Sequence, residues 1–386
     1  MNLLHLADLH LGKRVNGFDL LPDQRYILEQ VLDLCTAHNV QAVALAGDIY
    51  DTALPPAAAV LLLDWFLTEL AHRNIPVLAI AGNHDSAERL AVASRLLKWQ
   101  GLYIFGPLTR LSPVILEDAD GKVAFCPLPY AEPARVRVMM NTLGLEGADQ
   151  VHSYEEAETV LSRYLLSLLP SEPLQKVALA HAFAAGGTPS ESERPLSIGG
   201  YDRISDSVFE EYDYTALGHL HRPQKTQRES EKIQYSGSLM RYSFDEVNQK
   251  KGVIVGELDK EGKVHTTFHE MVPRYQVRCM EGTFDTLMGE ETEPSDDYLQ
   301  IRLTDETPVI DAMPKLRTKF PHALGVEQDM GYREDEGSRN IRLEQMSDED
   351  ILKRFVHQFR DRDLTEEEEK LALQTWDTVY RKENAQ

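Results

Sequence analysis

Five short motifs of aspartate, asparagine and histidine follow apolar runs in the first 221 residues of the chain. They are Asp-x-His, Gly-Asp, Gly-Asn-His-Asp, a single histidine and Gly-His-x-His. An apolar run that stops at a polar turn is typical of a buried strand, so we expect each motif at a strand end. Two residues spaced i, i+2 in extended chain point to one side, so two of the motifs can each present a pair of ligands. The candidate side chains are Asp8, His10, Asp48, Asn83, His84, His181, His219 and His221.

This mixture of oxygen and nitrogen ligands favours divalent ions such as Mn²⁺, Fe²⁺ or Zn²⁺ over copper(I) or iron–sulfur clusters. Gly47, Gly82 and Gly218 leave room beside the ligands for sharp turns and for close approach of a substrate. Taken singly, each motif has a simpler explanation, since a lone histidine is usually a surface or core residue and Gly-Asp usually forms a turn. The five motifs together, in this order, instead predict a divalent-metal centre.

The elements that must position these motifs alternate between strand and helix over roughly the first hundred residues. Residues 2–7, 41–46 and 76–81 are apolar runs of strand length, and helices are expected from Pro22 and over residues 55–71. This alternation predicts βαβ units around a buried sheet whose polar strand ends form the functional edge. Additional buried strands are expected over 123–127, 176–180 and 214–217, and the strands and turns over 234–269, with strands at 252–258 and 264–269, predict a second sheet that closes the same domain.

The pattern changes after residue 271. An alternating strand over 298–303, a helix over 309–320 that Pro314 interrupts and a strand over 323–328 predict a small α+β domain. Two tail helices are expected to begin at Ser347 and Thr365, each with an apolar face that packs on this chain or docks on a partner. The predicted domains are residues 1–271, 272–335 and 340–386.

Composition limits the class of protein. The net charge of −23 argues against a general DNA-binding surface, because nucleic-acid-binding domains normally carry a basic patch. DNA affinity would then have to come from bound metal, a limited surface or a partner chain. Three scattered cysteines, Cys35, Cys126 and Cys279, predict free thiols in a reducing cytoplasm. No apolar run is long enough to span a membrane, and His5 and Asp8 interrupt the N-terminal run, which is unlike a signal peptide.

The five motifs match D-x-H, G-D, G-N-H, H and G-H-x-H of the calcineurin-like metallophosphoesterases, and the chain resembles that family. The resemblance implies an α/β fold, a four-layer αββα sandwich that holds two metal ions. It also implies that His84 faces the phosphate as a general acid without binding metal, and that Asp51 orients and charges His84. The implied ligands are Asp8, His10 and His221 for one ion, Asn83, His181 and His219 for the other, and Asp48 as the bridge.

Longer stretches resemble one branch of that family, the SbcD nuclease subunits. These stretches are LHLADLHLG at the start, AGDIYDT at 46–52, ALGHLHR at 216–222 and YSGSLMRYSFDE at 235–246. The resemblance implies a nuclease that acts on double-stranded DNA ends and hairpins, with Mn²⁺ as the expected ion and Fe²⁺, Zn²⁺ or Mg²⁺ as alternatives. It also implies a homodimer whose C-terminal helices, residues 340–386, bind an SbcC-like ATPase of the SMC family.

Other functions stay open at this point. One is a stand-alone phosphatase or cyclic-nucleotide phosphodiesterase for a small substrate, and another is an inactive scaffold, against which the intact ligand set argues. No ATP-binding loop is evident, so any dependence on ATP would require a partner. Four basic residues follow the motifs and either contact DNA phosphates or are simple surface charges: Lys13, Arg14, Arg89 and Arg241.

Overall fold

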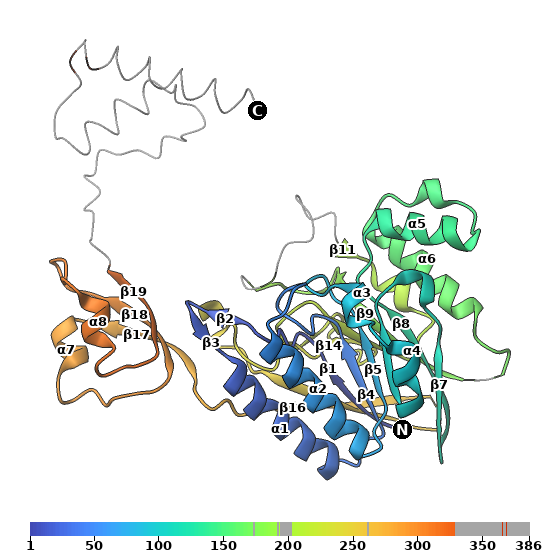
Figure 1. Ribbon diagram of the computed structural model, residues 1–386, viewed down its shortest axis with the longest axis horizontal. Coiled ribbons are helices and arrows are strands. Elements are labelled where there is room, and N and C mark those ends of the chain that lie inside the picture. The colour runs from blue at the N-terminus through green and yellow to red at the C-terminus, as the bar shows by residue number, and fades with distance from the viewer. Residues whose placement is uncertain are drawn as a thin grey trace. The chain divides into compact units, whose positions relative to one another are not determined.

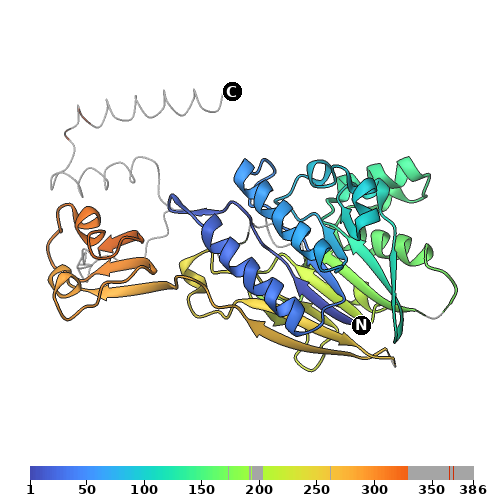
Figure 2. The same ribbon diagram turned by 60° about the horizontal axis from the view of Figure 1, so that its bottom comes forward.

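The computed structural model describes residues 1–172, 174–190, 193, 203–260 and 262–328, together with Thr365 and Glu368. Two six-stranded sheets lie face to face, and helices cover the outer side of each sheet (Figures 1 and 2). The predicted four-layer αββα sandwich is therefore confirmed. Apart from Thr365 and Glu368, the tail helices expected over 340–386 lie outside the described residues. No helix in the described part of the chain is long and apolar enough to cross a membrane.

The first sheet follows from the strand–helix alternation at the start of the chain. Its four earlier strands are parallel, because the connecting segments return the chain to the same end of the sheet each time. Two later strands extend this sheet: one pairs antiparallel with the free side of the first strand, and the other pairs antiparallel with that added strand. In order across the sheet, the strands are β16 (Val264–Glu270), β15 (Gly252–Leu258), β1 (Asn2–Leu6), β4 (Ala42–Ala46), β5 (Val77–Ile80) and β6 (Leu102–Phe105).

The second sheet has four parallel strands in its middle and an antiparallel strand at each edge. The prediction that β15 and β16 belong to this sheet is wrong. They extend the first sheet, because β4 occupies only one side of β1 and leaves its other side free to pair with β15. In order, the strands are β13 (Gln224–Lys225), β14 (Ile233–Tyr235), β12 (Tyr214–Gly218), β9 (Gln175–His181), β8 (Gly121–Leu128) and β7 (Val114–Asp118).

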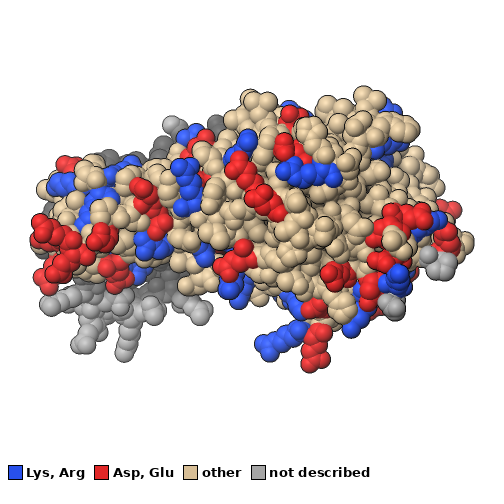
Figure 3. All heavy atoms as spheres, turned by 90° about the horizontal axis from the view of Figure 1, so that it is seen from below, with Lys and Arg blue, Asp and Glu red and all other residues tan. Residues whose placement is uncertain are grey.

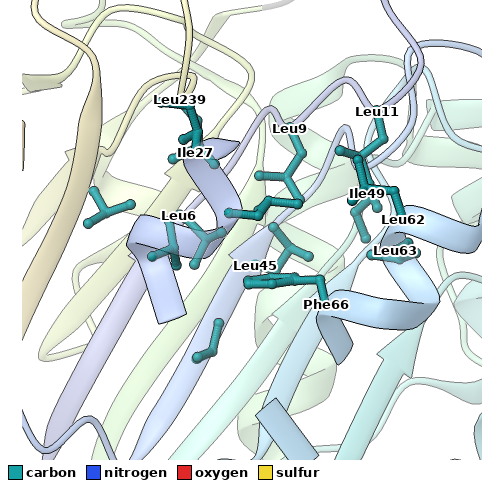
Figure 4. Packing of buried hydrophobic residues seen from close by; sticks show 14 of the residues in the cluster. Leu6, Leu9, Leu11, Ile27, Leu45, Ile49, Leu62, Leu63, Phe66 and Leu239 are labelled. Carbon is teal, nitrogen blue, oxygen red and sulfur yellow. The ribbon is translucent and has the colours of Figure 1, made fainter. Parts of the chain in front are cut away.

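Alternation along β1 shows how the layers share the core. Leu4 and Leu6 belong to the apolar cluster under the helices, with Phe66, whereas Leu3 belongs to the cluster between the two sheets. Figure 4 shows the helical side, where Leu6, Leu45 and Phe66 lie between the helices and the sheet. The long helices are α1 (Leu21–Ala37) and α2 (Ala57–His72) outside the first sheet, and α5 (Pro133–Leu143) and α6 (Tyr154–Ser167) outside the second.

Shorter elements join these layers. A hairpin follows the first motif, two single-turn helices follow the third, and a two-stranded parallel ladder follows β9. These elements are β2 (Arg14–Val15), β3 (Phe18–Asp19), α3 (Ala87–Leu90), α4 (Ser94–Leu97), β10 (Phe183–Ala184) and β11 (Arg203–Ile204).

Residues 277–328 form a separate three-stranded parallel sheet with its own apolar core. Buried Leu299 and Ile301 pack there with Leu316 and Phe320. The helix predicted over 309–320 is shorter, and Pro314 lies in its first turn, where the missing N–H costs no helical hydrogen bond. The elements are β17 (Val277–Gly282), α7 (Phe284–Met288), β18 (Tyr298–Leu303), α8 (Ala312–Leu316) and β19 (Ala323–Gln328).

Candidate metal centre

The five motifs meet at one edge of the sandwich. The first sheet carries them after β1, β4 and β5, and the second carries them at the ends of β9 and β12. Parallel strands place their carboxyl ends on the same side, so side chains that are far apart in the sequence come within reach of one another. The structure thus brings together Asp8, His10, Asp48, Asn83, His84, His181, His219 and His221.

The loops that carry the motifs are held in place by main-chain hydrogen bonds and unusual backbone angles. The Asp8 N–H donates to Gly47 O at 3.1 Å, and the His10 N–H donates to Asp48 O at 3.0 Å, which ties the first two motifs together. Asp8, His10, Asp48 and His219 have φ angles of 53°, 43°, 46° and 105°, which non-glycine residues adopt rarely. Such angles persist only where the surrounding structure enforces them, so these side-chain directions are fixed.

One group of potential ligand atoms comes from Asp8, His10 and His221. All three residues are buried, and their ligand atoms lie within 4.8 Å of one another. The Nε2 atoms of His10 and His221 are only 3.0 Å apart. Two neutral imidazoles can share at most one proton between these atoms, so a lone pair is available to a cation at this point.

A second group forms around the amide oxygen of Asn83. Asn83 Oδ1 lies 2.9 Å from His181 Nε2 and 3.2 Å from His219 Nδ1. Asp48 lies between the two groups, with Oδ2 at 3.5 Å from His181 Nε2 and at 3.8 Å from His10 Nε2. The donor set of carboxylate, amide and imidazole atoms therefore fits two divalent cations with one shared carboxylate.

Burial and mutual charge set the protonation of the cluster. Burial lowers the pKa of His10 to about 4 and, together with the charge of His181, that of His219 to about 3, so both imidazoles are neutral at pH 7. Burial also opposes the charged forms of Asp48 and His181, but their attraction to each other prevails. It holds the pKa of Asp48 well below its ordinary value and raises the pKa of His181 to about 9. Neutral imidazoles and an ionised carboxylate are the forms that bind metal.

His84 reaches the cluster from the loop after β5, and its ring is anchored differently from the sequence prediction. Its Nδ1 lies 2.8 Å from the main-chain carbonyl oxygen of Asp51. The Asp51 carboxylate, which we expected to pair with His84, instead lies 2.9 Å from Lys13 Nζ and 3.5 Å from His10 Nδ1. Lys13 and His10 hold the pKa of Asp51 below its ordinary value against the effect of burial. The carboxylate of Asp51 therefore orients a predicted ligand, and its carbonyl orients His84.

Glu246, a buried carboxylate next to the predicted ligand His221, was not among the residues predicted from the sequence. Its Oε1 lies 3.1 Å from His221 Nδ1, and its Oε2 lies 3.1 Å from Lys251 Nζ and accepts the Tyr242 N–H at 2.8 Å. Lys251 Nζ in turn donates to His221 O at 2.7 Å. A proton on His221 Nδ1 places the lone pair of the neutral ring on Nε2, so this carboxylate selects the tautomer suited to a metal ligand. The sequence does contain a signal for Glu246, because this residue ends one of the four stretches that carry the family resemblance.

Two further polar side chains brace the motif loops. The Asp85 carboxylate accepts main-chain N–H groups from Ile49 at 3.1 Å, Tyr50 at 2.9 Å and Gly82 at 2.9 Å, and so joins the second motif to the third. Gln24 Nε2 donates to the carbonyls of Leu9 and His10, and its Oε1 accepts the N–H of Gly12, which holds the loop of the first motif. Asp85 is the last residue of the Gly-Asn-His-Asp motif, whereas Gln24 carries no sequence signal of this role.

The four basic residues considered as phosphate contacts have partners within the protein. Lys13 pairs with Asp51, and Arg14 and Arg89 donate to the carbonyls of Gly17 and Ala53. Arg241 donates to Gln249 O and to Gln276 Oε1. These contacts supply a structural role for each residue. The three cysteines are free, and Cys279 is exposed.

Comparisons with known proteins agree with this geometry. The calcineurin-like phosphoesterase family model matches residues 1–223, and a model described as the type 5 capsule protein repressor C-terminal domain (SbcD_C) matches residues 273–359. The chain is 31% identical over 375 residues to the SbcD chain of the nuclease SbcCD from Staphylococcus saprophyticus, with 96% of each chain covered. It is 30% identical over 369 residues to that of Staphylococcus epidermidis, with 95% of each covered.

A solved structure of a dimetal phosphatase from Danio rerio covers 70% of this chain and is itself covered to 96%, at 14% identity and a TM-score of 0.38. The family assignment depends on the full-length relatives and on the family model, which spans more than half of the chain. The ligand set, the sandwich and these relatives agree with one another. The chain is a metal-dependent hydrolase that belongs to the calcineurin-like phosphoesterases, and within them to the family of the SbcD nuclease subunits.

Proposed function

We propose that this nuclease subunit hydrolyses DNA phosphodiester bonds at double-stranded ends and hairpins, using two divalent ions held at the edge of the sandwich. The observation that carries the proposal is the position of Asp48 between two groups of donors, all of them buried except the partly buried Asn83. When bound, the ions lower the pKa of an attacking water and offset the charge that develops on the phosphoryl oxygens. The proposed ligands are Asp8, His10 and His221 for one ion, Asn83, His181 and His219 for the other, and Asp48 for both.

Mn²⁺ is the ion we propose first, with Fe²⁺, Zn²⁺ and Mg²⁺ as alternatives. The set contains two carboxylates, one amide and four imidazoles, and this balance of oxygen and nitrogen suits Mn²⁺ and Fe²⁺. Competition between these ions for the chelator-treated protein, followed by calorimetry, gives their order of affinity.

His84 is the proposed general acid. Its Nδ1 must carry a proton, because the Asp51 carbonyl oxygen can only accept a hydrogen bond. Its Nε2 lies 3.9 Å from Asp48 Oδ2 and so faces the cluster. A proton on Nε2 can pass to the leaving oxygen of the cleaved bond, while Asp51 fixes the ring plane.

The decisive experiment is His84→Ala, tested with Mn²⁺ on a duplex and on a hairpin. Cleavage is expected to fall at least about 100-fold, which is the lower range for loss of a general acid, while calorimetry still shows two bound ions. His265→Ala is the matched control, because its side chain is 54% exposed and lies on β16. Undiminished cleavage by His84→Ala would remove His84 from the mechanism. Faster turnover of phosphomonoesters or cyclic nucleotides than of DNA would favour a small-substrate hydrolase.

The C-terminal part of the chain supplies the proposed partner contacts. The relatives are named as the D component of a nuclease called SbcCD, which supports an SbcC-like SMC-family ATPase as partner, with residues 340–386 as its binding segment. We also propose that residues 272–335 form a capping domain that helps to bind DNA, and that the protein works in the cytoplasm. Deletion of residues 340–386 is expected to abolish co-purification with such an ATPase while Mn²⁺ binding persists.

We propose that the protein forms a homodimer, because large apolar side chains are exposed around α2, α3 and α4. Leu61 is 67% exposed, Val92 68%, Leu96 71% and Trp99 78%, which is unusual for large apolar residues. The Arg89 guanidinium donates to the carbonyl of Ala53 at 3.0 Å, which ties the segment before α2 to the segment that contains α3 and α4. Light scattering of Leu61→Glu/Trp99→Glu is expected to give a monomer, against a dimer for the unaltered chain.

A further inference from the structure

A pocket of about 510 Å³ lies along the edge of the sandwich where β6 of the first sheet meets the start of β7 in the second. Arg95, Lys98 and Arg110 line this β6–β7 pocket, and no carboxylate does. The chain has 63 acidic and 40 basic residues, and on the face shown in Figure 3 the two kinds are interspersed without a continuous basic stripe. Three cations without an acid therefore set this pocket apart from the surface as a whole.

In the part of the chain that the structure describes, the three pocket cations have no acidic partner, unlike those exposed cations that form ion pairs. Some exposed lysines elsewhere form ion pairs, as Lys122 does with Glu172 and Lys250 does with Glu270. Within the described residues, no carboxylate lies within 4.0 Å of the charged atoms of Arg95, Lys98 or Arg110. Their charge is thus available to an anion from outside, and no local carboxylate has to be displaced first.

The pocket lies beside the loop that carries the third motif. The Ala81 N–H donates to the carbonyl of Phe105 at 2.9 Å, and Phe105 is the last residue of β6 and lines the pocket. Ala81 comes two residues before the predicted ligand Asn83. Gly106, which also lines the pocket, contacts Ala87 so closely that a Cβ would lie 2.0 Å from the Ala87 carbonyl oxygen. A DNA strand whose cleaved bond lies at the metal centre could therefore continue into this pocket.

Aromatic side chains complete the wall. Tyr103 and Phe105 alternate on β6 with the more deeply buried Leu102 and Ile104, and both aromatic rings are partly exposed. Cations along a groove together with aromatic faces are the combination that binds single-stranded nucleic acid, because the phosphates meet the cations and the unpaired bases stack. A duplex offers its phosphates but keeps its bases stacked inside.

We propose that the β6–β7 pocket binds a short single-stranded segment of the DNA substrate, next to the bond that is cleaved. The inference rests on the proposed function, because it assumes a DNA substrate. It assigns to Arg95, Lys98 and Arg110 the contacts with backbone phosphates, and to Tyr103 the stacking with one base. A frayed duplex end or the unpaired loop of a hairpin supplies such a segment.

The test measures binding of a fluorescent oligo-dT by anisotropy, in chelator and at several salt concentrations, so that no cleavage occurs. The pocket variant is Arg95→Gln/Lys98→Gln/Arg110→Gln. The matched control is Lys260→Gln/Lys263→Gln/Arg302→Gln, which removes the same charge from exposed residues away from the pocket, where Lys260 and Arg302 have carboxylate partners. Loss of three phosphate contacts is expected to lower the slope of log K against log salt by about 2, and the control is expected to keep the slope.

Tyr103→Leu is expected to weaken oligo-dT binding at least about fivefold and to change binding of a blunt duplex less, because only unpaired bases stack. Thermal unfolding of every variant checks that the fold is retained. Equal slopes for the pocket and control variants would overturn the proposal, as would equal losses on oligo-dT and duplex for Tyr103→Leu. The proposed nuclease function fails separately, if the unaltered chain cleaves no DNA with Mn²⁺ although it binds oligo-dT through the pocket.

Discussion

Replacement of Glu246 tests whether the buried carboxylate behind His221 prepares that residue to bind metal. Glu246 is fully buried, and its two oxygens contact His221 Nδ1 and Lys251 Nζ at 3.1 Å each. Glu246→Gln keeps an oxygen that can accept the proton of His221 Nδ1, but it removes the charge and replaces the oxygen that accepts from the Tyr242 N–H and Lys251 Nζ with a donor NH2 group. Glu246→Ala removes both oxygens and the charge, and leaves Lys251 buried without the carboxylate that balances its charge.

The size of each effect follows from these contacts. Loss of a carboxylate that orients a metal-binding histidine typically weakens metal binding 10- to 100-fold, so we expect about 100-fold for Ala and about 10-fold for Gln. Removing one partner of a buried ion pair costs about 3–5 kcal/mol of stability. Glu246→Gln/Lys251→Met removes both charges, so it should regain most of that stability and still bind metal weakly.

The assay is calorimetric titration of the chelator-treated protein with Mn²⁺ at pH 7.5, together with urea unfolding in chelator. Asp213→Ala is the matched control, because Asp213 accepts a main-chain N–H from Lys176 at 2.7 Å at the start of β9, the end opposite His181. The reasoning is refuted if Glu246→Ala binds Mn²⁺ with unchanged affinity, or if the double variant recovers affinity along with stability. The first outcome would limit Glu246 to a structural role, through its contacts with Lys251 and Tyr242.

Three further predictions follow from the same geometry. A Cβ at Gly82 would lie 2.1 Å from Asp48 Oδ1, so Gly82→Ala is expected to weaken Mn²⁺ binding, measured by calorimetry, at least about tenfold. Gly256→Ala is the control and should keep the affinity for Mn²⁺, because no atom would lie nearer than 3.8 Å to its Cβ. Burial lowers the pKa of His181, but the charge of Asp48 raises it further, so the pKa is about 9 in the metal-free protein. Because a metal ion must displace the proton of His181, the affinity for Mn²⁺ should rise by about tenfold per pH unit up to pH 9. An affinity that does not change with pH would contradict this protonation. Burial raises the pKa of Glu158 on α6 to about 8, so this group destabilises the fold increasingly as pH rises from 4.5 to 8. By urea unfolding in chelator, Glu158→Gln is expected to be up to about 4 kcal/mol more stable than the unaltered protein at pH 7.5 but no more stable at pH 4.

The predicted ligands could be read from the sequence because each lies next to a buried strand. A run such as that of β4, Ala42–Ala46, is buried along its whole length, and the first polar residues after it are forced to the sheet edge. The order of the strands within each sheet was harder to predict from the sequence. β15 and β16 have the apolar pattern of either sheet, and only the free side of β1 decides between them.

Contacts that depend on main-chain atoms or distant loops escaped prediction for a physical reason. The sequence shows that Asp51 is near His84, but not that its carbonyl faces the ring while its carboxylate faces Lys13. Glu246 lies 25 residues from His221, across a loop whose path has no periodic pattern. The sequence therefore predicted which side chains gather at the candidate metal centre more fully than it predicted the side chains that contact them.

The pairing of β1 with β15 has a consequence for how the protein is made. Leu3 pairs with Gly256, so one side of β1 has no partner until some 250 residues later in synthesis, as their positions imply. During that time an apolar strand with free N–H and C=O groups is exposed, which favours pairing with another nascent chain. Ribosome-bound chains that end before β15 should therefore depend on chaperones more than chains that extend past residue 270.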